Sequence, residues 1–137
     1  MADWNSNIIE EFRANEGRVG GMFEGAPLLL LHSTGRRSGK ERVNPMMYLP
    51  DGKRWIVFAS KGGHTAQPHW LHNLEANPEA TIEVGTETIS VKATVLHEGP
   101  ERDELYARQV AAYPQFGEYE EKTKGHRTIP VIVLAHA

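Results

Sequence analysis

One stretch of sequence decides the fold, and it reads Leu28-Leu-Leu-Leu-His-Ser-Thr-Gly-Arg-Arg-Ser-Gly-Lys-Glu-Arg-Val-Asn-Pro-Met-Met-Tyr-Leu49. Its apolar start predicts a buried strand over Leu28–Ser33, and Val43–Leu49 predicts a second strand. Between these strands, four cations lie in the seven residues from Arg36 to Arg42. A glycine-containing, positively charged loop can hold an anionic ligand against its backbone N–H groups.

Apolar and alternating runs predict four further strands, over Arg54–Ala59, Thr81–Val84, Thr88–His97 and Ile129–Leu134. Asp51-Gly52 precedes the first of them, and this dipeptide favours a hairpin turn. Helical spacing predicts helices over Trp4–Phe12 and Pro68–Asn77, and a third that begins at Pro100. The pattern predicts a mainly β (α+β) fold: about six antiparallel strands in a barrel-like sheet with flanking helices.

Composition narrows the class of protein. The chain has 137 residues, a net charge of −3 and no cysteine. This length is typical of one domain, and the charge argues against a general nucleic-acid binder. The lack of cysteine excludes disulfides, thiolate zinc sites and cysteine nucleophiles. No apolar run is long enough to predict a transmembrane helix, and the N-terminus lacks the features of a secretory signal, so we expect a cytoplasmic protein.

The predicted N-terminal helix is amphipathic. Trp4, Ile8, Ile9 and Phe12 are spaced for one face. This face could pack on the domain, act as a lid, or contact the inner face of the cell membrane. We favour packing, because membrane-surface helices are usually rich in lysine and arginine.

Nucleotide-binding motifs do not fit the cationic loop. Only three residues separate Gly35 from Gly39, and Glu41 occupies the position of the hydroxyl in a phosphate loop. A ligand-binding anion loop and a solvated hairpin tip remain equal alternatives. A second loop, Ser60-Lys61-Gly62-Gly63, follows the strand over Arg54–Ala59. Two such loops indicate one ligand with a long negative tail.

Three histidines, His64, His69 and His72, do not predict a metal site, because no carboxylate lies among them and no H-E-x-x-H motif occurs. Trp70 packs either in the core or on a flat ligand ring. The chain also lacks an evident nucleophile, which favours a protein that holds a cofactor able to perform the chemistry.

Aromatic residues recur every three positions at Tyr113, Phe116 and Tyr119. They line either a pocket or a helix face in the core.

Four blocks of sequence resemble the deazaflavin-dependent nitroreductases, also described as F420H2-dependent quinone reductases. The blocks are Thr34–Pro45, Ile56–Gly63, Pro68–Pro78 and Arg127–Val131. The resemblance extends in order from about Pro27 to Leu134. It implies a split β-barrel like that of FMN-binding proteins. Together with the predicted N-terminal helix, this divides the chain into a helical segment over residues 1–20 and a split β-barrel deazaflavin-binding domain over residues 21–137.

The resemblance also implies coenzyme F420, in its reduced form F420H2, as the cofactor. By this analogy one group of residues contacts the phosphate and polyglutamate tail: Arg36, Arg37, Ser38 and Arg42. A second group lines the deazaflavin: Val43, Asn44, Pro45, Met46 and Met47. A third group completes the site: Phe58, Ala59, Ser60, Lys61, His69, Trp70, Leu71, His72 and Asn73.

The implied reaction is hydride transfer to quinones, nitroaromatics or conjugated lactones. Ser60, Tyr113 and Tyr119 resemble residues that orient the acceptor or donate a proton. The chain departs from the characterised nitroreductases at Phe116, where they carry a tyrosine, so we expect weak reduction of nitroimidazoles and intact cofactor binding. The alternatives are an FMN-binding flavin reductase-like protein and a non-catalytic cofactor-binding module. We expect no nucleic-acid partner, and the oligomeric state stays open.

Overall fold

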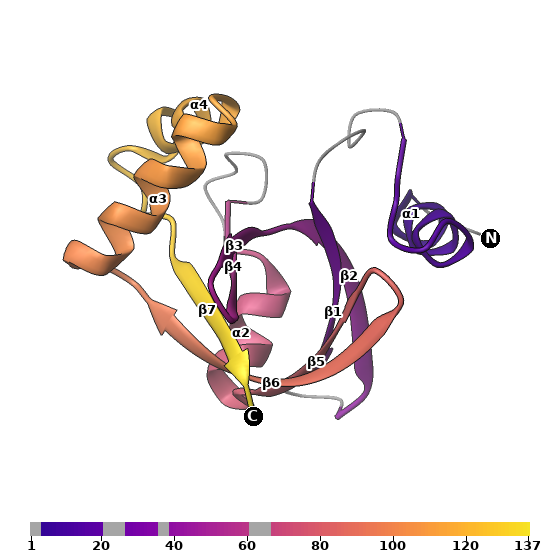
Figure 1. Cartoon of the computed structure of the whole chain (residues 1–137). Helices are drawn as coiled ribbons and strands as arrows, with labels where there is room; N and C mark the ends of the chain where they lie inside the picture. Colours follow the sequence, from indigo (N-terminus) through magenta and orange to yellow (C-terminus); the bar gives the residue numbers. More distant parts are fainter. Residues whose placement is uncertain (1–3, 21–26, 36–38, 61–66) are drawn as a thin grey trace.

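The structure is a computed structural model that describes residues 4–20, 27–35, 39–60 and 67–137 (Figure 1). Its helices are α1 (Trp4–Ala14), α2 (His69–Ala76), α3 (Pro100–Ala112) and α4 (Gln115–Thr123). Its strands are β1 (Leu28–Thr34), β2 (Glu41–Met47), β3 (Leu49–Asp51), β4 (Arg54–Phe58), β5 (Glu79–Val84), β6 (Glu87–Leu96) and β7 (Val131–His136).

The strands form one antiparallel sheet in the order β2-β1-β5-β6-β7-β4-β3. Although β2 and β3 lie at opposite edges of this sheet, only Tyr48 separates them in the chain. The sheet must therefore curl until its two edges come together at Tyr48, and Figure 1 shows the strongly curved sheet that results. The Tyr48 amide donates a hydrogen bond to the Pro27 carbonyl at 3.1 Å, which fixes this crossing beside the start of β1.

Side chains alternate between the two faces of the curled sheet, as expected for strands. The inward-facing side chains form the barrel core, which α2 joins: Leu29, Leu31, Val57, Ala59, Leu71, Leu74, Ile82, Val91, Ala93, Ile132 and Leu134. The α1 cluster lies outside, with Phe12, Val19, Leu28 and Leu30. The α3–α4 cluster also lies outside, with Ile56, Phe58, Leu105, Tyr106, Phe116, Ile129, Val131 and Val133.

The predicted antiparallel barrel-like fold is confirmed, with two differences. The strand predicted over Val43–Leu49 is divided at Tyr48, because the chain there crosses between sheet edges, and so the described residues hold seven strands instead of six. Helix α4 was not predicted as an element. Pro114, which follows the end of α3, serves as the N-cap of α4.

Helix α1 packs on the sheet, the alternative that we favoured. Phe12 is 1% exposed in the α1 cluster, and Ile8 and Ile9 pack partly buried against it. Within the described ranges, no helix is long and apolar enough to cross a membrane. The last turn of α1 leads into Gly17, at φ +94°, where an added Cβ would lie 2.8 Å from the Gly85 Cα. A close backbone contact therefore ties the end of α1 to the β5–β6 turn.

Candidate functional site

Strand β2 carries partly exposed side chains on both of its faces. Its five residues from Val43 to Met47 are all partly exposed, and β2 is an edge strand of the sheet. Met46 packs against the barrel core, whereas Val43 packs against the α1 cluster. Met47 contacts both the α1 cluster and the α3–α4 cluster. The residues predicted to line a deazaflavin therefore occupy one accessible strand, and Met47 lies where the two outer clusters meet.

Positive charge lies at the opposite end of β2. Arg42 is exposed, and no ion pair joins it to another residue of the described ranges. The β1–β2 turn beside it is closed by the Gly35 amide, which donates to the Lys40 carbonyl at 2.7 Å, and by the Gly39 amide, which donates to the Gly35 carbonyl at 2.9 Å. The predicted tail contacts Arg36, Arg37 and Ser38 lie outside the described residues.

The end of β4 leads into the second predicted loop. Phe58, Ala59 and Ser60 are buried, and their order places Phe58 in the α3–α4 cluster and Ala59 in the barrel core. Ser60 is 8% exposed. Lys61 lies outside the described residues. The strand alternation thus directs two neighbouring candidate residues to opposite faces of the sheet.

The Arg127 side chain holds the end of β4 in place through hydrogen bonds, a role that the sequence analysis did not assign. Its Nη1 donates to the Ala59 carbonyl at 2.9 Å and to Gln67 Oε1 at 2.7 Å, and its Nη2 donates to the Ser60 carbonyl at 3.0 Å. Burial lowers the pKa of the Arg127 guanidinium. Arg127 thereby connects the residues on both sides of positions 61–66. The available signal was its place shortly before the last apolar strand, which was predicted to begin at Ile129 and begins at Val131.

The candidate residues on α2 differ in their access to a ligand. Leu71 is fully buried in the barrel core, while His69 is exposed. Trp70 is partly buried against the core. Asn73 is buried, and its Nδ2 donates to Ser33 Oγ at 3.3 Å. His72 Nδ1 lies 3.6 Å from Glu75 Oε1. The side chains of Leu71 and Ala59 present no surface to a ligand, because both are 0% exposed.

The three aromatic residues near α4 have different environments. Tyr113 and Tyr119 are half-buried against the α3–α4 cluster, whereas Phe116 is 5% exposed within it. The Phe116 ring makes edge-on contacts with Phe58 at 5.7 Å and Tyr119 at 5.1 Å between ring centroids. Two tyrosines therefore present hydroxyl-bearing rings at the edge of the cluster, and Phe116 supports them from the core.

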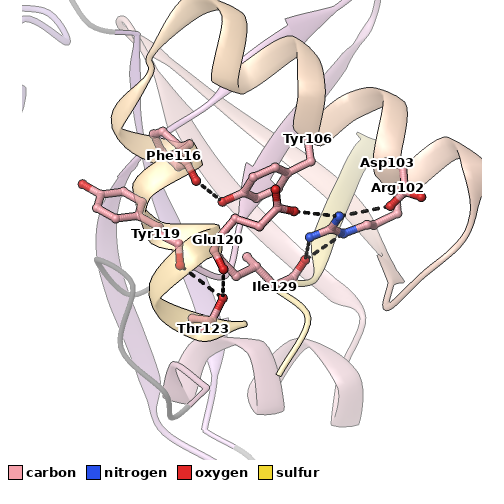
Figure 2. Close-up of polar contacts among 8 residues, drawn as sticks. All are labelled: Arg102, Asp103, Tyr106, Phe116, Tyr119, Glu120, Thr123 and Ile129. Atoms are coloured by element: carbon pink, nitrogen blue, oxygen red, sulfur yellow. Dashed lines mark hydrogen bonds and ion pairs between the residues drawn. The ribbon is translucent and has the colours of Figure 1, made fainter. Parts of the chain in front are cut away.

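A polar network beneath these aromatic residues was missed by sequence reasoning (Figure 2). Arg102 Nε and Nη2 both donate to the Ile129 carbonyl at 3.0 Å. Arg102 Nη1 contacts Glu120 Oε2 at 3.3 Å and Asp103 Oδ1 at 3.0 Å. The Tyr106 hydroxyl donates to the Phe116 carbonyl at 2.6 Å, and burial raises the pKa of this phenol. The only sequence signal was an arginine within the buried face of α3.

Gln109 is another unpredicted feature of α3. It is fully buried, and neither its Nε2 nor its Oε1 has a hydrogen-bond partner in the part of the chain that the structure describes. A buried amide without partners is unfavourable for stability. Gln109 lies one helical turn before Tyr113, and its backbone carbonyl accepts a hydrogen bond from the Tyr113 backbone N–H at 2.8 Å.

A curled antiparallel sheet with helices on its outer face defines a split β-barrel protein. A solved F420-H2 dependent reductase shares this fold, with a TM-score of 0.71 and 37% identity over 79% of this chain and 93% of that one. A domain-swapped dimer has a TM-score of 0.72 and 34% identity, and covers 94% of this chain and 92% of its own. The heme storage protein HutZ from Vibrio cholerae, at 18% identity and a TM-score of 0.61 over 94% of this chain and 87% of its own, shares the fold alone.

The sequence comparisons define the family. The family model described as F420H(2)-dependent quinone reductase matches residues 4–136. An F420H(2)-dependent quinone reductase of Mycobacterium tuberculosis is 37% identical over 127 residues, which cover 90% of this chain and 83% of the relative. The chain belongs to the F420H(2)-dependent quinone reductase family. This confirms the predicted family, the oxidoreductase class and reduced coenzyme F420 as the cofactor.

The described residues fit a cofactor with a flat ring and an anionic tail. The half-buried surface of β2 ends near the aromatic residues at Met47 and near positive charge at Arg42. These two residues are about 17 Å apart along an extended strand, at about 3.4 Å per residue. This strand is therefore long enough to carry a ring at one end and place a phosphate near cations at the other.

Proposed function

We propose that this protein transfers a hydride from reduced coenzyme F420 to a quinone, with the cofactor along β2 and the acceptor beside Tyr113 and Tyr119. The observation that carries the proposal is the position of Met47, which contacts both outer clusters and so joins the binding strand to the aromatic residues. The proposed site combines a half-buried apolar surface, a cationic end and two phenol groups.

The cationic end binds the cofactor tail. Arg42 supplies one exposed guanidinium, and we assign Arg36, Arg37 and Lys61 to the same role. A guanidinium gives phosphate and carboxylate groups two parallel hydrogen bonds, whereas a lysine supplies a point charge. Arg127 acts differently, because its hydrogen bonds to the Ala59 and Ser60 carbonyls hold the backbone there in place.

The aromatic residues bind and orient the acceptor. When bound, the reduced coenzyme supplies the hydride. Phe58 and Met47 exclude water from the acceptor side, because both belong to the packed apolar surface. A phenol O–H donated by Tyr113 or Tyr119 to a quinone oxygen stabilises the negative charge that develops there during reduction. We assign Ser60 to the same hydrogen-bonding set.

Quinones are favoured over nitroaromatics and conjugated lactones as acceptors. A quinone oxygen needs few donors, and the described aromatic residues supply two phenols. Phe116 adds no donor, because phenylalanine has no hydroxyl, and its ring packs among Phe58, Tyr106 and Tyr119. We therefore expect nitroaromatics and lactones to be reduced more slowly than menadione.

The test is a titration with F420 and FMN, followed by single-turnover oxidation of F420H2 with menadione. Saturable F420 binding and menadione-dependent oxidation are expected. Tight FMN binding without F420 binding would indicate a flavin reductase-like protein, and binding without turnover of any acceptor would indicate a non-catalytic module.

The tail assignment is tested separately. Arg42→Ala should weaken F420 binding about tenfold, as expected for a lost charge-assisted contact. Lys92→Ala is the matched control, because it removes an exposed cation from β6. Equal affinity in both variants would contradict the placement of the tail at Arg42.

A further inference from the structure

Helix α4 is attached to α3 at two points. The Tyr106 hydroxyl donates to the Phe116 carbonyl in the first turn of α4, at 2.6 Å. One turn further along α4, the Glu120 carboxylate contacts Arg102 Nη1 at 3.3 Å. Arg102 and Tyr106 are four residues apart, so they lie on one face of α3. Figure 2 shows both contacts reaching across from α3 to α4.

Both α3 residues are fixed by burial. Arg102 is 5% exposed and Tyr106 is 2% exposed. All three guanidinium nitrogens of Arg102 have acceptors, and its Cζ lies 4.6 Å from the centroid of the Tyr106 ring. A buried charge is tolerated only when it is paired and hydrogen-bonded, so Arg102 has few alternative positions. The Ile129 carbonyl extends the same network to the start of β7.

Between the two attachment points lies Tyr119, a residue proposed to contact the quinone. Tyr119 lies in α4 between Phe116 and Glu120, and its ring contacts the Phe116 ring at 5.1 Å. Tyr113 follows directly after α3. The distance between these two tyrosines therefore depends on how α4 is held against α3.

We propose that Arg102 and Tyr106 are positioning residues for the quinone, because they hold α4 so that Tyr119 faces the acceptor together with Tyr113. This inference rests on the proposed function. Neither Arg102 nor Tyr106 needs to touch the acceptor, since both act through Glu120 and the Phe116 carbonyl. Reactions that depend on orientation are sensitive to displacements of about 1 Å, so a small shift of α4 is enough to change the rate.

The first test is Tyr106→Phe, which keeps the ring and removes the hydroxyl. We expect kcat/KM for menadione to fall about tenfold, mainly through KM, while F420 affinity stays within about twofold of wild type. A purely structural role would lower the amount of folded enzyme and leave the KM of the folded fraction unchanged.

A second pair of variants keeps the test informative if Tyr106→Phe folds poorly. The Glu120 side chain is 51% exposed, so Glu120→Ala should fold. It should raise the menadione KM, and Glu120→Gln, whose amide oxygen can still accept from Arg102, should restore most of the loss. Glu121→Ala removes the same charge from α4 without touching Arg102 and is the matched control.

Hydrogen exchange gives a readout that does not depend on turnover. Loss of either contact should accelerate exchange of the α4 amides more than that of the α3 amides. Faster exchange with an unchanged menadione KM would overturn the positioning role, and unchanged exchange would overturn the attachment itself. Absence of quinone turnover in the wild-type protein would overturn the proposed function and this inference with it, whereas normal wild-type turnover with unaltered variants would overturn only the inference.

Discussion

The α1 cluster and the α3–α4 cluster cover the same outer face of the sheet and meet at Met47, but different forces attach them. Helix α1 relies on apolar packing of Phe12, an exposed ion pair from Arg13 to Glu83 at 2.7 Å, and the close backbone contact at Gly17. The α3–α4 pair adds a buried polar network. Apolar packing tolerates small sliding movements, whereas directed hydrogen bonds define one arrangement.

In the proposed function, this difference gives the two clusters different tasks around β2. The α1 side supplies a covering surface for β2. The α3–α4 side holds polar groups in fixed directions, and a hydride transfer is sensitive to the orientation of the groups around the acceptor. Four substitutions test whether the two clusters are attached in these different ways.

The largest effect is expected when the buried network is broken. Arg102→Ala should lower the free energy of unfolding by about 3–4 kcal/mol, because it leaves the Ile129 carbonyl without its two donors and removes a buried side chain that packs on the Tyr106 ring. Denaturant unfolding measures this change. Arg108→Ala on the same helix breaks a partly exposed ion pair with Asp51 at 2.9 Å and should cost at most about 1 kcal/mol. Equal effects of the two variants would remove the distinction between buried and exposed contacts.

The backbone contact at the end of α1 gives the next effect. Gly17→Ala should cost about 2–3 kcal/mol, because φ is +94° and the new Cβ would lie 2.8 Å from the Gly85 Cα. Gly52→Ala isolates the backbone contribution, since Gly52 has φ +61° and no neighbouring atom within 4 Å of the added Cβ. Thermal unfolding of both variants separates the clash from the backbone strain. Similar losses in both would show that α1 is not held through Gly85.

Substitution of Gln109 is expected to raise the free energy of unfolding, in contrast to the two preceding variants. Gln109→Met preserves length and removes two buried polar atoms that have no partner among the described residues, so it should stabilise the fold by about 1–2 kcal/mol. Gln115→Met, at a partly exposed position of α4, is the control and should change little. Denaturant midpoints measure both variants. Destabilisation by Gln109→Met would mean that the amide makes favourable interactions in solution.

The smallest effect concerns the ion pair of α1. The Arg13 hydrogen bond, followed by a contact with His32, lowers the pKa of Glu83 from its ordinary value of 4.5. Because the folded-state pKa is depressed, this pair stabilises the fold above about pH 4.5, and the stabilisation is lost as pH falls through the folded-state pKa. Arg13→Ala should therefore cost less than about 1 kcal/mol at neutral pH and flatten the acid limb of the stability profile. Arg18→Ala should leave that limb unchanged.

The strands were predictable where burial on both faces produced continuous apolar runs. Leu28–Leu31 is such a run, because Leu29 and Leu31 enter the barrel core while Leu28 and Leu30 face α1. The break at Tyr48 was not predictable, since the apolar pattern continues across it. Helix α4 was hidden because it begins after Pro114 and contains Gly117, where a Cβ would lie 3.4 Å from Val110 Cγ1.

The candidate site was predictable as a set of segments and less so as side-chain directions. The block over Val43–Met47 does form one accessible strand, but strand alternation sends Met46 and Met47 to opposite faces. Arg102 could not be identified from local sequence, because arginines are usually exposed. Its burial depends on the carbonyl of Ile129, which lies 27 positions away in the chain.

The single residue that joins β2 to β3 also limits which length changes this chain can accommodate. Tyr48 closes the seam of the barrel with no spare length, and its amide is held by the Pro27 carbonyl. An insertion at this seam would shift β2 along its own axis and move Met47 away from the aromatic residues. Length changes are better tolerated in exposed turns such as that around Gly52, where an added side chain meets no neighbour. The one-residue connection at Tyr48 therefore sets the register of β2 relative to the aromatic residues.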